Sequence, residues 1–371
     1  MFSRSLIAAA ALVLMFAPAA APQSPQKLIP RIELPADAPV EMLSADWGDS
    51  SATPRGGAFI VDVRAALSFR NAGQRRIRGV TLAVLSQEVT PGGKGSVSVP
   101  SLDVAPGETF PVNINLHLLR PIGAPGGPSV EVRLDGVLFD DLNFYGPDQL
   151  HSRRMMTVWE LEARRDRQYF KKLLEQAGGK GLQEAVIESL ARQAPADAPP
   201  GMQILRGRAT NADPESEVSY AFLHFPGAPV DASNGMVRIA GNEAQAPRVE
   251  VINRSPRPIR YLEIGWIVKD KEGREFMGPS MPADVSLAPG RSGHVGQDAS
   301  MSFNKRISIQ GMTGFISSVG FTDGTYWIPD RNELNDPKLR HVVGPSPEEQ
   351  RLAQLYLKRG LNGLIEELKK F

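Results

Sequence analysis

The chain has 371 residues, a length that suits two domains of ordinary size better than one small domain. Its 42 basic and 41 acidic residues give a net charge of +1, so it lacks the excess of basic side chains that is typical of nucleic-acid-binding proteins. It contains no cysteine, which excludes disulfides, a thiol nucleophile, thiolate metal sites and a lipid-anchored N-terminal cysteine. We expect no cofactor and no nucleic-acid partner.

Residues 1–21 are predicted to be a secretory signal peptide. Arg4 supplies the positive start, residues 6–16 the apolar run, and residues 17–21 a small-residue cleavage zone. The apolar run is short for a membrane span, which needs about 20 residues. We therefore expect an exported protein, periplasmic or secreted, with no transmembrane segment in the mature chain. An uncleaved membrane anchor is the alternative interpretation.

Residues 22–56 are rich in Pro, Ala and Asp and are predicted to form a linker with one short strand at 27–34. Residues 57–150 then show several short segments with apolar residues at period two, separated by Gly, Pro and Asn. Strands in series without helices between them predict an antiparallel β-sandwich.

Residues 151–194 are predicted to be helical. Apolar residues at helical spacing indicate one amphipathic helix at 153–177, and Gly178 and Gly179 end it. A second helix follows at 181–194, and residues 195–201 form a linker. Basic and acidic side chains are interleaved on the first helix, so we expect its polar face to be solvated and its apolar face to dock on its own sandwich.

A second β module is predicted at 202–335, and C-terminal helices at 345–371. Ser346 and Glu349 form a capping box, with Pro347 at the first helical position. We expect this helix to pause at Gly360 and then to resume.

The chain repeats itself at a separation of 182 residues. Asn71 aligns with Asn253 (253 − 71 = 182), and Phe139 and Asp141 align with Phe321 and Asp323. An Ala-Pro-Gly turn at 105–107 returns at 288–290, one residue out of step, as a loop allows. We therefore predict a mainly β protein with helical inserts: two tandem antiparallel Ig-like β-sandwiches, each followed by a helix pair, produced by an internal duplication.

The residues around the two asparagines carry turn chemistry. Asn and Gly tolerate turn conformations, and Pro256 and Pro258 cannot extend a ladder. This strand–turn–strand pattern, at 249–273 and again at 285–290, resembles bacterial Ig-like or fibronectin-like cell-envelope modules. Such modules usually act as binding or spacer domains, which the resemblance implies for this chain.

The sequence contains few candidate functional residues. The five histidines are scattered, and no catalytic or phosphate-loop motif is complete. Two aromatic pairs occupy matching positions in the repeats and are candidate ligand-binding residues: Phe144 and Tyr145, and Tyr326 and Trp327. Such rings could stack on sugar or grip a peptide, or they could fill the core at a strand end. No catalytic residue and no metal ligand is predicted.

We therefore expect an exported, non-catalytic binding or scaffold protein of the bacterial cell envelope, whose partner is an envelope protein or a glycan. Two alternatives stay open. The aromatic pairs and the acidic residues near them would suit a carbohydrate-binding or carbohydrate-processing protein. An edge strand or the helix at 153–177 would suit a peptide- or partner-binding assembly factor.

Overall fold

The computed structural model describes residues 25–88, 91–124, 127–192, 203–206, 216–296, 299–303 and 307–371. The predicted signal peptide at 1–21 and the predicted linker at 195–201 lie outside these residues. The chain divides into two units, which are described separately. Unit 1 comprises Met1–Arg70, Leu82–Val97 and Thr109–Leu134; unit 2 comprises Asn71–Thr81, Ser98–Glu108 and Asp135–Phe371.

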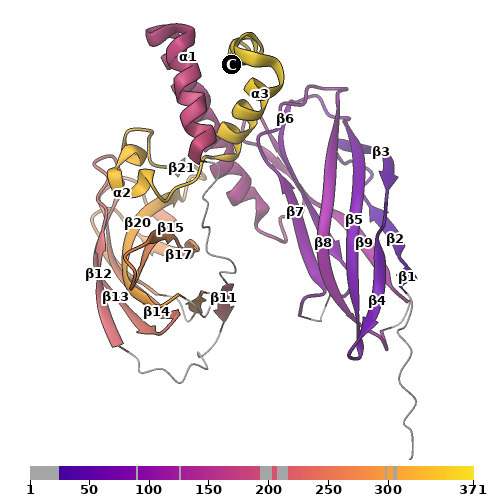
Figure 1. The fold of residues 1–371 in the computed structure, drawn as a ribbon, viewed down its shortest axis with the longest axis horizontal. Helices are drawn as coiled ribbons and strands as arrows, with labels where there is room; N and C mark the ends of the chain where they lie inside the picture. Colours follow the sequence, from indigo (N-terminus) through magenta and orange to yellow (C-terminus); the bar gives the residue numbers. More distant parts are fainter. Residues whose placement is uncertain are drawn as a thin grey trace, which may run out of the picture. The chain divides into compact units, whose positions relative to one another are not determined.

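The first β module consists of two five-stranded sheets (Figure 1). One sheet has the order β1-β4-β5-β3 with β8 paired to β5, and the other has the order β10-β9-β6-β7 with β2 paired to β9. The strands are β1 (Gln26–Lys27), β2 (Ile29–Glu33), β3 (Val40–Asp46), β4 (Ser51–Arg55), β5 (Ala58–Asn71), β6 (Ile77–Leu85), β7 (Lys94–Val99), β8 (Thr109–Pro121), β9 (Ser129–Phe139) and β10 (Phe144–Tyr145).

Buried side chains at every second position of β5 and β8 form the core of unit 1. Val61, Val63, Leu67 and Phe69 on β5 are buried, while the residues between them are more accessible. Strand β8 pairs with β5 in antiparallel register over its whole length, and Phe110 stacks on Phe69 with ring centroids 5.8 Å apart. Period two thus places one face of each strand in the interior.

The expected linker at 22–56 is instead a series of strands. Strands β1 to β4 all lie within it, and Val40 and Ala52 are buried. The pattern was hidden because β1 and β3 end the strand order of their sheet and β2 pairs with β9 alone. Most side chains of β1, β2 and β3 are exposed, so these strands carry little apolar alternation.

The second β module lies in unit 2 and forms one continuous path of strands, β11-β19-β14-β13-β12-β20-β15-β16, to which β17, β18 and β21 add. Trp266 on β15 is fully buried at its centre and meets the ring of Tyr220 edge-on at 4.9 Å. The strands are β11 (Gln203–Arg206), β12 (Ser216–Phe222), β13 (Val230–Ala240), β14 (Glu243–Asn253), β15 (Ile259–Asp270), β16 (Glu275–Met277), β17 (Met281–Leu287), β18 (Ser292–Gly296), β19 (Ala299–Ser302), β20 (Ile309–Phe321) and β21 (Tyr326–Trp327).

The modules are not wholly antiparallel, which corrects the sequence-based prediction. Strand β2 pairs in parallel with β9, and β12 pairs in parallel with β20. In each module the chain changes partner within a few residues. Strand β1 pairs with β4 before β2 joins β9, and β12 pairs with β13 up to Tyr220 and with β20 from Ala221. A strand that changes partners in this way can lie beside the last long strand of its module, and the two strands then run in the same direction.

The two long helices each contain one sharp break. Helix α1 (Ser152–Arg192) breaks at Gly178 with φ 68° and ψ −167°, and α3 (Pro347–Leu368) breaks at Gly360 with φ 66° and ψ −170°. Both dihedral pairs lie where only glycine is comfortable, which confirms the predicted breaks. The capping box is also confirmed: the Ser346 side chain accepts from the Glu349 amide, and the Glu349 side chain accepts from the Ser346 amide.

The two helix pairs share one apolar core, defined here as the helix-pair core. It consists of Phe170, Leu182, Val186, Leu352, Ala353, Leu364 and Leu368. The start of α1 packs differently: Met156 lies against Gly79, and Thr81 donates a hydrogen bond to its sulfur at 3.5 Å. The part of α1 after Ala163 packs on α3 (Figure 1), so the expectation that the apolar face of α1 docks on its own β module is corrected for that part of the helix. Short helices η1 (Glu333–Asn335) and α2 (Pro337–Arg340) complete the unit and were not predicted.

Asn71 and Asn253 are buried and make matching hydrogen bonds. The Asn71 amide group donates to the carbonyls of Arg75 at 2.9 Å and Val104 at 3.0 Å. The Asn253 amide group donates to the carbonyls of Arg257 at 2.8 Å and Leu287 at 3.0 Å. Each side-chain oxygen accepts a backbone amide two residues on. These asparagines therefore hold a turn onto a neighbouring chain segment.

Candidate functional site

The aromatic pairs predicted as ligand-binding residues form short edge strands in matching register. Phe144 and Tyr145 pair with Leu138 and Val137, and Tyr326 and Trp327 pair with Gly320 and Val319. All four side chains are partly buried. Phe144 packs so closely on Gly136 that a Cβ there would lie 2.1 Å from the ring, and a Cβ at Gly320 would lie 2.9 Å from the Tyr326 ring. Phe144 and Tyr326 thus contribute to packing.

Trp327 lines an open hollow of about 550 Å³ in unit 2. Two of the acids in the hollow serve the local structure. Glu333 accepts from the amides of Gly227 at 2.9 Å and Asp330 at 2.8 Å, and Asp336 caps α2 by accepting from Lys338 at 2.8 Å. The full lining is His224, Phe225, Pro226, Gly227, Trp327, Asp330, Asn332, Glu333, Asn335 and Asp336.

A second cavity, of about 450 Å³, is more enclosed and is called here the helix–sheet cavity. Its walls come from α1, β16, β20, the segment after β21 and α3. Its apolar lining residues are Ala185, Met277, Phe315, Pro329, Leu334 and Val343. Its charged lining residues are Glu162, Arg165, Glu188, Arg192, Arg331, Arg340 and Glu349. The volume suits a small organic molecule.

The arginines of the helix–sheet cavity are paired with carboxylates. Arg331 lies 2.5 Å from Glu349 and 3.3 Å from Asp166, and Arg192 lies 2.9 Å from Glu349. Arg165 lies 3.1 Å from Asp166, and Arg340 pairs with Glu188. Burial acts to raise the pKa of Glu349, but the hydrogen bond and charge of Arg331 hold that pKa below its ordinary value. The carboxylate therefore stays ionised.

Glu162 differs from these carboxylates. Among the described residues it has no hydrogen bond and no ion pair, although it lines the helix–sheet cavity. Burial raises the pKa of Glu162 to about 7, and the negative charges of Asp166, Glu263 and Glu349 add to the rise while Arg165 opposes it. Glu162 is thus a carboxyl group that changes charge near neutral pH.

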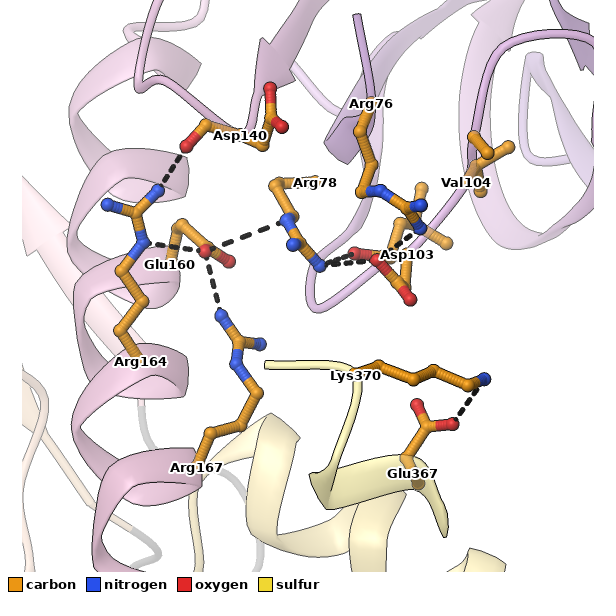
Figure 2. Close-up of polar contacts among 12 residues, drawn as sticks. Arg76, Arg78, Asp103, Val104, Asp140, Glu160, Arg164, Arg167, Glu367 and Lys370 are labelled. Carbon is orange, nitrogen blue, oxygen red and sulfur yellow. Dashed lines mark hydrogen bonds and ion pairs between the residues drawn. The ribbon is translucent and has the colours of Figure 1, made fainter. Parts of the chain in front are cut away.

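A network of buried ion pairs lies on another face of α1 (Figure 2). Glu160 is 2% exposed and receives Arg164 at 2.9 Å and Arg167 at 2.8 Å, with Arg78 3.8 Å away. Arg78 also reaches Asp103 at 2.7 Å. Burial lowers the pKa of Arg78, and the charges of Glu160 and Asp103 counteract this. The network joins β6, the loop after β7 and α1.

The network continues into α3. Arg167 lies 3.4 Å from the fully buried Glu348, which also binds Arg351 at 2.8 Å. Arg351 reaches Glu367 at 2.7 Å. Lys370 also reaches Glu367 at 2.7 Å (Figure 2). Removing one member of a buried pair leaves an uncompensated charge, so such a network specifies one arrangement of its elements. Its geometry supports a structural role rather than catalysis.

Neither the helix–sheet cavity nor the ion-pair network was predicted from the sequence. The cavity joins Glu162 to Arg331 and Glu349, which are remote from it in the chain. The ion-pair network joins Arg78 to Glu160 and Glu348. The run of charged residues on α1 is a signal of this network in the sequence, but interleaved acids and bases predict a solvated face. The apolar face at 153–177 is largely covered, since Met156, Ala163 and Phe170 are buried.

Within the described ranges no group of three or more His, Asp or Glu side chains is placed to hold a metal ion. Likewise, none of the helices in the described part of the chain is long and apolar enough to cross a membrane. Asp141 and Asp323 are two of the acidic residues near the aromatic pairs. Each accepts the amide two residues on, at 3.0 Å and 2.9 Å, and they pair with Arg75 and Arg257. They hold turns.

Comparison with known proteins identifies no family. No family model matches the chain, and no curated protein matches it. Among solved structures, a hypothetical protein from Peptoclostridium difficile 630 is 12% identical, covers 34% of this chain and 99% of its own, and has a TM-score of 0.23. A DUF1425 family member from Shewanella sp. pv-4 is 15% identical, covers 31% and 94%, and has a TM-score of 0.18. A β-glucosidase from Kluyveromyces marxianus is 10% identical, covers 78% and 48%, and has a TM-score of 0.18. These similarities are too weak to carry an argument about function.

Proposed function

We propose that the chain is an exported, non-catalytic binding or scaffold protein of the bacterial cell envelope, and that it consists of two Ig-like modules, each followed by a helix pair, derived from one duplicated unit. The observation that carries the proposal is the helix-pair core, in which Phe170, Leu182 and Val186 pack with Leu352, Leu364 and Leu368. A core shared by two remote segments fixes their arrangement, which is what a scaffold requires.

Three sets of matching features support the duplication. Each of three apolar residues from α1 has a counterpart in α3 that lies 182 residues later in the chain. Phe170 corresponds to Leu352 (352 − 170), Leu182 to Leu364 (364 − 182) and Val186 to Leu368 (368 − 186). The broken helices have nearly the same dihedral angles at Gly178 and Gly360. Arg75 stacks on Phe139 at 4.0 Å and Arg257 stacks on Phe321 at 3.5 Å. Long-separated contacts of identical kind are expected of a copied unit.

The ion-pair network supports a rigid assembly. Glu160 and Glu348 are nearly inaccessible, so their ion pairs with Arg167 are protected from screening by salt. Breaking one such pair costs about 3–5 kcal/mol. Such rigidity suits a protein that presents fixed surfaces to a partner, because little conformational entropy is then lost on binding.

In-cell crosslinking of the tagged protein, followed by mass spectrometry, tests the proposal. We expect one or two envelope proteins to be recovered reproducibly, and to be lost when residues 1–21 are deleted so that the chain is not exported. Recovery of the same proteins from the deletion variant would contradict an envelope role. Hydrolysis of ester, glycoside or peptide substrates by the purified protein would contradict a non-catalytic one.

Carbohydrate binding is the second candidate, because Trp327 lines an open hollow together with His224, Asn332 and Asn335. A partly exposed indole beside amide groups can stack on a sugar ring while the amides bind its hydroxyls. Retention on immobilised glycans tests this: Trp327→Ala should abolish it, whereas Trp47→Ala, a partly buried tryptophan of unit 1, should not. Equal retention of both variants would remove the candidate.

A further inference from the structure

We propose that the helix–sheet cavity is a binding site for a small primary amine, whose ammonium group pairs with Glu162 and whose hydrocarbon part lies against Met277, Phe315 and Val343. The cavity holds about 450 Å³ and belongs wholly to unit 2. This inference does not depend on the scaffold role, because it rests on the lining of the cavity alone.

The charges of the cavity select a cation. Each lining arginine already has a carboxylate: Arg331 and Arg192 share Glu349, Arg165 has Asp166, and Arg340 has Glu188. An anionic ligand would therefore have to displace an existing ion pair. Glu162 is the lining carboxyl group that has no ion pair among the described residues, so a cation gains a partner without breaking one.

Three acidic side chains act on Glu162. Asp166 lies four residues on along α1, Glu263 contributes from β15 and Glu349 from α3, and all three act to raise the pKa of Glu162. Arg165 acts in the opposite sense, and it is bound to Asp166 and to the carbonyl of Pro329 at 3.0 Å. Tyr169, Glu188, Arg192, Arg331 and Arg340 are the other ionisable groups of the wall.

The apolar part of the wall determines the rest of the ligand. Met277 on β16 and Phe315 on β20 line the side formed by the sheet, and Ala185, Leu334 and Val343 line other sides. Ligand sites combine apolar surface with a few placed polar groups, so the apolar part of this wall suits a hydrocarbon body and Glu162 suits one cationic group. Glycans and polyanions do not meet this description, whereas an alkylamine or arylalkylamine does.

Titration of the purified full chain with hexylamine, hexanol and hexanoate tests the proposal, since the three probes share a carbon chain and differ in charge. Isothermal titration calorimetry should show hexylamine binding at least about tenfold more tightly than the other two. Glu162→Gln should weaken hexylamine by about tenfold or more, and Glu175→Gln, which removes an exposed charge from the same helix, should not. Glu162→Asp, which withdraws the carboxylate by one methylene, should give an intermediate loss and serves if Glu162→Gln does not fold.

The pH dependence gives an independent readout. Hexylamine stays protonated near neutral pH, so any change in its affinity reports the protein. Because Glu162 must be ionised to bind, affinity should fall about tenfold between one pH unit above and one unit below its pKa of about 7. No measurable binding of hexylamine, tighter binding of hexanoate, or equal losses in Glu162→Gln and Glu175→Gln would each overturn the proposal.

Discussion

Replacing Asn253 by alanine removes a group of buried side-chain hydrogen bonds from the second β module. The side chain donates at 2.8 Å to Arg257 and at 3.0 Å to Leu287, and it accepts from the Ser255 amide at 2.9 Å. Leu287 is buried, so its carbonyl would lose a partner that water cannot easily replace. One unsatisfied buried acceptor costs about 1–3 kcal/mol and each of the other two bonds about 0.5–1.5, so we expect a loss of about 2–6 kcal/mol from these three contacts.

Urea unfolding followed by tryptophan fluorescence measures this loss, because Trp266 is fully buried in the same module. Asn71→Ala should cost somewhat less, since Asn71 makes the same three bonds but lacks the fourth, which Asn253 accepts from the Ser255 hydroxyl at 2.8 Å. Asn362→Ala changes an exposed asparagine of α3 and should stay within about 0.5 kcal/mol. A loss below about 1 kcal/mol for both buried asparagines would refute the view that they hold their turns in place.

Three further predictions follow from the helices. Glu160→Gln should destabilise the protein by about 3–5 kcal/mol in urea, because it removes the buried charge that Arg167 and Arg164 share and leaves Arg167 with Glu348 alone, whereas the exposed Glu175→Gln should be neutral. Gly360→Ala should cost about 1–3 kcal/mol by the same assay because φ is 66°, whereas Gly344→Ala, which has open space and no positive φ, should not. Acid should weaken the packing of α3, because the pKa of Glu349 is lowered on folding. The stability that ionised Glu349 contributes is therefore present above the ordinary pKa of 4.5 and is lost as pH falls through the folded-state pKa. Glu349→Gln should flatten this part of the stability–pH curve. Equal slopes for the wild type and this variant would contradict the assignment.

Local sequence signals predicted the ends and breaks of the two long helices correctly. The capping box at Ser346 and the glycines at 178 and 360 act within a few residues, so their effect is visible in the chain itself. The strand pattern of β5 was also clear, because buried and more accessible residues alternate along it. A mainly β protein followed from these signals.

The edge strands were missed for a physical reason. Strands β1, β2 and β3 are held by backbone pairing and have mostly exposed side chains, so their composition resembles that of a linker. The parallel pairings of β2 with β9 and of β12 with β20 depend on where the chain changes sheets, and side-chain periodicity carries no information about that.

The candidate sites could not have been located from the sequence. Glu162 becomes unusual only when Asp166, Glu263 and Glu349 come from three elements to surround it. The charged run on α1 indicated a solvated face because acids and bases alternate along it, yet Glu160 and Arg167 are buried by segments far away in the chain. Such burial is a property of tertiary packing.

Native-state hydrogen exchange tests most directly the central claim, that the two helix pairs form one cooperative core. We expect the amides of α1 from residue 165 onward and those of α3 to share one opening free energy. Leu364→Ala should lower it in both helices by about 2–5 kcal/mol, because Leu364 is fully buried in the helix-pair core, whereas Leu357→Ala, at 59% exposure, should not. Loss of protection confined to α3 would contradict a shared core and, with it, the proposed scaffold.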